Sequence, residues 1–165
     1  MGGTAPENYP VIYAVADGII DRIDYSFQVG ENDRYGMDLA FAKSGNLVFL
    51  FSYSIEPMVP EPSVGFYKKF IRVEPGQHVK QGDTLAYMYL PSTVGIASHI
   101  HFHLQQKEQN NFFAPAIFTN EVVDSFHERW GDFGYDGSIP IPVCMGYMLD
   151  AGENPYGDGP VDILK

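Results

Sequence analysis

The stretch SHIHFHL, residues 98–104, contains three histidines at alternate positions, His99, His101 and His103. The whole chain has five histidines, so most of them lie in this one stretch. Alternating polar and apolar residues are typical of a β-strand, in which successive side chains point to opposite faces of a sheet. We therefore predict a strand over 99–106, with the three histidines on one face and apolar side chains on the other.

Clustered histidines suggest a metal site, but strand geometry limits which of them can share an ion. Residues i and i+4 of a strand lie about 13 Å apart. His99 and His103 are therefore too far apart to bind one ion at a Zn–N distance of about 2.0–2.1 Å. Adjacent histidines of the row lie about 6.6 Å apart and can share an ion. A third ligand must then come from elsewhere, and Asp38 and Glu31 are the candidates.

The residues before this stretch predict further strands joined by turns. Aromatic residues make up 15% of the chain, which also contains 17 Gly and 12 Pro. This composition favours short strands and turns over long helices. Strand-like segments, separated by polar or Gly/Pro-rich turns, occupy residues 11–28, 37–42, 47–55 and 66–90, with a polar turn at 30–36 and turns at Pro75-Gly76 and Gly82-Asp83.

Helical spacing is confined to the C-terminal part of the chain. TNEVVDSFHERW, residues 119–130, begins with capping residues and places apolar side chains at helical intervals, which predicts one short helix. Residues 131–165 are rich in Gly, Pro and Asp and predict an irregular tail. We expect an all-β domain over 1–118, with the helix and tail of 119–165 packed on it.

Charge and cysteine content exclude several classes of function. The net charge of −11 opposes binding to nucleic acid and to anionic lipid. The single cysteine, Cys144, leaves no internal disulfide and no cysteine-based zinc site. No stretch is long and apolar enough to span a membrane, and the start MGGTAP lacks the features of a signal peptide.

Three segments in order carry a family resemblance: YAVADGIID at 13–21, VEPGQHVKQGDTLAYM at 73–88, and SHIHFHL. Together they resemble the LytM/lysostaphin-type zinc endopeptidases, which cut peptidoglycan cross-links. The resemblance covers about residues 5 to 118. It implies a barrel-sandwich fold (the duplicated hybrid motif) and an extracytoplasmic location, whether periplasmic, cell-surface or secreted. It also implies a cell-wall peptide or another envelope protein as the partner.

The resemblance also assigns roles to individual residues. In that family a His-x-x-x-Asp motif before the first strand and the second histidine of His-x-His hold the zinc. The zinc ligand of the His-x-His motif corresponds to His101, and the histidine that orients the attacking water corresponds to His99. The first two ligands are missing, and Tyr53 stands where a further assisting histidine is expected. Tyr53 and His103 are predicted to line the groove that binds the substrate in this family.

Another segment resembles the family's missing His-x-x-x-Asp metal motif. GMDLA, residues 36–40, has the family's Gly-x-Asp-Leu-Ala pattern, but it follows the first hairpin, and Arg34 stands at the histidine position. We therefore do not assign it to the metal site.

These observations lead to a predicted function. We expect a degenerate LytM-like domain, without peptidase activity in this form, that acts in binding or regulation at the cell envelope. Zinc is expected to be absent or weakly bound. One alternative is a zinc-dependent endopeptidase that cleaves peptidoglycan cross-links or Gly-rich peptides and whose first metal ligands lie outside this chain. The other is a structural β domain of a surface protein.

Overall fold

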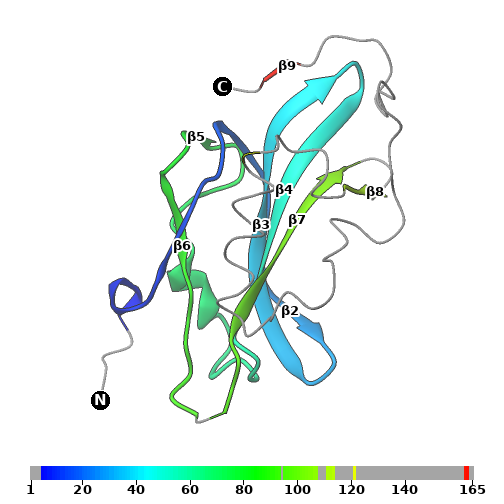
Figure 1. Ribbon diagram of the computed structural model, residues 1–165. Coiled ribbons are helices and arrows are strands. Elements are labelled where there is room, and N and C mark those ends of the chain that lie inside the picture. Colours follow the sequence, from blue (N-terminus) through cyan, green and yellow to red (C-terminus); the bar gives the residue numbers. More distant parts are fainter. Residues whose placement is uncertain (1–4, 94, 108–110, 114–120, 122–161, 164–165) are drawn as a thin grey trace. The chain divides into compact units, whose positions relative to one another are not determined.

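The computed structural model describes residues 5–93, 95–107, 111–113, 121 and 162–163, and β-strands dominate them (Figure 1). The all-β prediction is confirmed. The predicted helix and tail lie outside the described residues, with two exceptions. Glu121 is helical, and Asp162–Ile163 form a two-residue strand. The chain divides into two compact units, Met1–Asn111 with Gly159–Lys165, and Phe112–Asp158. All that follows concerns the first unit.

The elements follow one another along the chain with short connections. The 3-10 turns are η1 (Pro6–Asn8) and η2 (Tyr67–Phe70), and the strands are β1 (Val11–Tyr13), β2 (Gly18–Val29), β3 (Asn32–Ser44), β4 (Leu47–Glu56), β5 (His78–Val79), β6 (Thr84–Tyr87), β7 (His99–Gln106), β8 (Asn111–Phe112) and β9 (Asp162–Ile163).

The strands form a large sheet and a small one. The large sheet has the order β5-β2-β3-β4-β7-β8, with β9 paired to β3, and its four longest strands lie side by side in Figure 1. Strands β1 and β6 form the small, two-stranded sheet. The pairs β2–β3, β3–β4 and β4–β7 are all antiparallel, so the histidine strand lies beside β4 from the middle of the chain.

Two turns match their prediction, and one predicted turn is a strand instead. Gly76 and Gly82 have φ angles of 83° and 89°, which glycine adopts without strain. Residues 30–36 were expected to form a turn, yet β3 already begins at Asn32. The strand extends this far because Tyr35 is fully buried and anchors it to the core. The segment contains polar residues because alternate side chains point to the opposite face of the sheet, where Arg34 pairs with Glu56.

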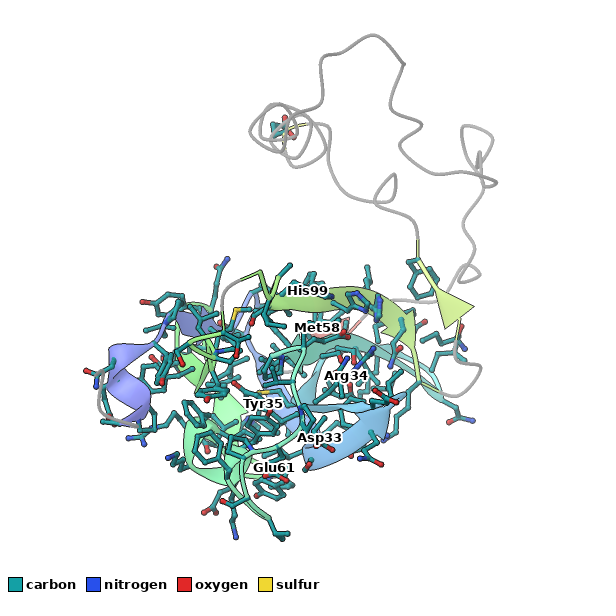
Figure 2. All side chains as sticks on the ribbon, turned by 90° about the horizontal axis from the view of Figure 1, so that it is seen from below. Asp33, Arg34, Tyr35, Met58, Glu61 and His99 are labelled. Carbon is teal, nitrogen blue, oxygen red and sulfur yellow. The ribbon has the colours of Figure 1, made fainter. Side chains whose placement is uncertain are left out.

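Buried tyrosines fasten the small sheet to the large one. The Tyr35 hydroxyl donates to the carbonyl oxygen of Tyr87 in β6 at 2.6 Å and accepts from the N–H of Tyr89 at 2.8 Å. The Tyr53 hydroxyl donates to the carbonyl oxygen of Tyr13 in β1 at 3.3 Å and accepts from the N–H of Val15 at 3.1 Å. Figure 2 shows Tyr35 on the side of the small sheet, with Arg34 away from it.

The register of β4 and β7 decides which residues share a face. Paired residues point to the same side of a sheet, and neighbours along a strand point to opposite sides. Tyr53 pairs with Phe102, on the apolar side that faces the core. Ser54 pairs with His101, and Glu56 with His99, on the other side. We call this second side the polar face; it carries Arg22, Arg34, Asp38, Ser52, Ser54, Glu56, His99, His101 and His103.

Candidate metal-binding site

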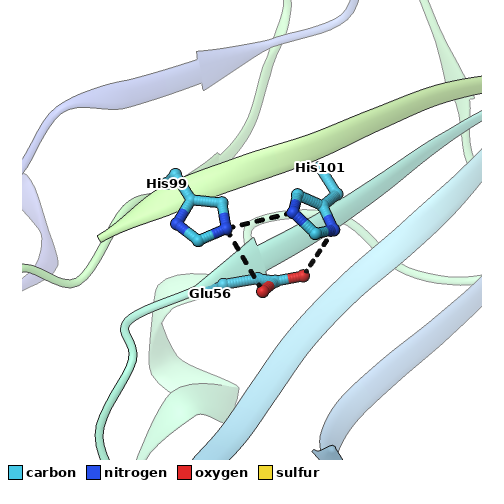
Figure 3. A group of neighbouring side chains, drawn as sticks. All are labelled: Glu56, His99 and His101. Atoms are coloured by element: carbon cyan, nitrogen blue, oxygen red, sulfur yellow. Dashed lines mark hydrogen bonds and ion pairs between the residues drawn. The ribbon is translucent and has the colours of Figure 1, made fainter. Parts of the chain in front are cut away.

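Glu56, His99 and His101 meet at the end of β4 where it pairs with β7 (Figure 3). The Nε2 atoms of the two histidines lie 3.1 Å apart. His99 Nε2 lies 3.4 Å from Glu56 Oε2, and His101 Nδ1 lies 3.1 Å from Glu56 Oε1. One donor atom from each residue falls within 4.8 Å of the other two, so the three can hold a metal ion.

Hydrogen bonds fix the tautomers of both histidines. His99 Nδ1 lies 2.9 Å from the carbonyl oxygen of Ala97, which only accepts, so this nitrogen carries a hydrogen. His101 Nδ1 donates in the same way to the carboxylate of Glu56. A contact such as that between His99 and the Ala97 carbonyl orients metal-binding histidines in proteins and leaves the other nitrogen to bind the ion.

The remaining nitrogens of the two histidines lie close enough together to bind one ion. With both Nδ1 atoms protonated, the two Nε2 lone pairs face each other across 3.1 Å. Two bare lone pairs at this distance repel each other, whereas a proton or a metal ion between them turns repulsion into attraction. The tetrahedral edge for a Zn–N distance of about 2.0–2.1 Å is about 3.4 Å, so the spacing of the donors suits a metal ion.

Glu56 is a buried carboxylate whose charge is well compensated. Its side chain is 1% exposed, and Arg34 Nη1 contacts Oε1 at 2.6 Å. The hydroxyl of Ser54 and His101 Nδ1 donate to the same oxygen, at 3.2 Å and 3.1 Å. Arg34 therefore pairs with Glu56 and holds Oε1. Oε2 remains beside His99 Nε2, where it could bind the same metal ion as the histidines.

The structure brings together only part of the predicted site. His99 and His101 converge as predicted, with side chains 41% and 48% exposed. His103 lies next along the row, and its ring centroid is 6.0 Å from that of His101. Burial, and then the neighbouring His101, lower the pKa of His103, while Glu56 opposes the shift.

Tyr53 does not belong to this face. It was expected in the groove, but it is 4% exposed and packs in the core, its ring 5.1 Å from that of Phe102. Burial raises the pKa of Tyr53 to about 12, against the hydrogen bond from Val15. The physical reason is parity: Tyr53 is an odd number of residues from Glu56, so it points to the opposite face of β4.

The third member of the cluster, Glu56, is a residue that the sequence analysis missed. Asp38 is held by Arg22 Nε at 3.0 Å, and Glu31 is exposed outside the cluster. Glu56 was assigned to the loop that follows β4, yet the strand continues through it. Polar residues at alternate positions, Ser52 and Ser54 before Glu56, were the available indication.

Comparisons with known proteins add no family assignment. No protein-family model, no curated protein and no solved structure matches this chain. In the described part of the chain, no helix has the length and apolar character needed to cross a membrane.

Proposed function

We propose that this protein binds a divalent transition-metal ion through Glu56, His99 and His101, and that its metal-loaded polar face acts as a binding site. One observation carries the proposal: two Nε2 atoms 3.1 Å apart, beside a buried carboxylate. Two imidazoles and one carboxylate are a ligand set that zinc uses in proteins. The metal would be held by the domain's own strands, without the upstream ligands that the family resemblance implies.

The same contacts favour binding over hydrolysis. In zinc hydrolases a carboxylate that is not a ligand often serves as the general base. Among the described residues, the carboxylate within reach of the two histidines is Glu56, and it would serve as the ligand itself. We therefore keep the proposal of a degenerate LytM-like domain that binds a cell-wall peptide or an envelope protein. An extracytoplasmic location is part of this proposal.

Zinc titration by calorimetry tests the metal site. The protein should bind one zinc ion with micromolar or tighter affinity. His101→Ala and Glu56→Gln should each weaken binding at least about tenfold, because each removes one of three ligands. His78→Ala is the matched control, since His78 lies in β5 outside the cluster, and it should leave affinity unchanged. Zinc binding that survives both ligand substitutions would refute the site.

A second candidate, zinc-dependent peptide hydrolysis, is favoured by one feature. Three protein ligands leave a fourth position for water, and both histidine side chains are partly exposed. Incubation of the zinc-loaded protein with peptidoglycan separates the possibilities. Release of cleaved peptide that is abolished by His101→Ala supports hydrolysis, whereas zinc-dependent co-sedimentation without cleavage supports binding. If neither occurs, the structural β-domain alternative is favoured.

A further inference from the structure

Arg34 has a donor that its ion pair does not use. Its Nη1 atom contacts Glu56, and its Nε atom is buried without a hydrogen-bond partner among the described residues. The side chain is 19% exposed, so it lies just beneath the surface of the polar face. Buried polar groups are nearly always hydrogen-bonded, and a buried donor without a partner indicates a bound water or ion, local strain or a functional role.

Resting on the proposed metal site, we propose that the metal-loaded centre binds a carboxylate group of a ligand. One oxygen of the carboxylate takes the remaining coordination position of the metal, and the guanidinium of Arg34 binds the other. Arginine suits this role because its guanidinium stays charged and carries several N–H donors, so it can donate to the free carboxylate oxygen. The ligand class is therefore a peptide with an accessible carboxylate.

Charge explains why the ligand would be an anion and why it would bind only after the metal. Without metal, Glu56 and Arg34 neutralise each other. A divalent cation outweighs the single charge of Glu56, so the loaded cluster becomes positive. The metal also partly neutralises the negative charge of Glu56, so that Glu56 attracts Arg34 less strongly. The guanidinium can then turn its Nε edge, buried in the ion-paired form, toward the ligand.

The charge of the whole chain favours a carboxylate over a phosphate. The net charge of −11 repels anions at long range. This long-range repulsion grows with the charge of the ligand. A singly charged carboxylate therefore enters more easily than a doubly charged phosphate.

The test uses Co²⁺ as a spectroscopic probe and acetate as the simplest carboxylate. Acetate should change the visible absorption of the Co²⁺-loaded protein and should not bind the metal-free protein. Acetate should also raise the apparent metal affinity, because a ligand that binds only the metal-loaded form favours that form by linkage. An N-acetylated dialanine with a free C-terminus should replace acetate, and its amide should not. If the dialanine peptide with the free C-terminus does not bind but a peptide amide containing glutamate does, the ligand is an acidic side chain.

Substitutions of Arg34 provide the second arm. Arg34→Lys keeps the charge and loses the guanidinium, and Arg34→Met removes both. Each should weaken acetate binding to the Co²⁺-loaded protein about tenfold or more, as expected when a charge-assisted hydrogen bond is lost. Arg72→Met is the matched control, because Arg72 pairs at 3.7 Å with Glu7 outside the polar face.

The outcomes separate this inference from the proposed function. Normal metal binding without an acetate response, or with a response unchanged in both Arg34 variants, overturns the carboxylate site and leaves the metal site standing. Acetate binding to metal-free protein, or tighter binding of inorganic phosphate, also overturns it. Failure to bind metal at all overturns both proposals.

Discussion

Replacing Arg34 with methionine should make the stability of the protein depend on metal. Glu56 is 1% exposed and Arg34 19%, so the substitution leaves a nearly buried carboxylate without its cationic partner. Breaking a buried ion pair in this way costs about 3–5 kcal/mol. Water partly reaches the pair, and Ser54 and His101 still donate to Glu56. We therefore expect a loss of about 2–3 kcal/mol in the free energy of unfolding.

Urea unfolding in the presence of a chelator measures this loss, and a double-mutant cycle isolates its cause. Arg34→Met should cost clearly less in a protein that already carries Glu56→Gln, because a neutral amide needs no counter-charge. Arg72→Met should change stability by less than about 0.5 kcal/mol, since its ion pair is exposed.

Zinc should then rescue the Arg34→Met protein more than it stabilises the unaltered protein. Metal present at about 100 times its Kd stabilises a folded protein by about 2.7 kcal/mol. In the variant, the uncompensated charge of Glu56 strengthens metal binding, so the gain should be larger. An equal cost of Arg34→Met with and without the Glu56→Gln substitution, or an absent zinc effect, would refute the reasoning.

Three further predictions concern the scaffold. Stability should be full below pH 10 and fall by roughly 3 kcal/mol as the pH rises from 10 through 12, from Tyr53 alone, because its pKa rises from 10.0 to about 12 on folding and the unfolded chain loses its proton first. Urea unfolding of Tyr53→Phe should show a correspondingly shallower alkaline slope. Gly36→Ala should destabilise the protein by about 2 kcal/mol or more in urea unfolding, since the new methyl group would press on the carbonyl oxygen of Tyr53. Met58→Gly should raise the thermal midpoint, with a gain of up to about 1 kcal/mol, because Met58 has a φ of 61°; an unchanged or lower midpoint would contradict this strain.

Local patterns predicted much of the scaffold. Alternation in HIHFHLQQ predicted β7 and the common face of its histidines, because side-chain direction along a strand has a period of two residues. The turns at Gly76 and Gly82 were predictable because glycine tolerates positive φ. The resemblance to LytM-type peptidases remains a prediction, since it rests on short motifs with no matching family model.

The third member of the Glu56, His99 and His101 cluster was decided by tertiary structure. Whether Tyr53 or Glu56 faces His99 depends on the parity of each residue in β4 and on where the strand ends. It also depends on the register between β4 and β7, which joins residues far apart in the sequence, such as Glu56 and His99. The sequence by itself determined a row of histidines on one face of a strand. Only the pairing of distant strands, which core packing selects, brought a buried carboxylate and its arginine to that row.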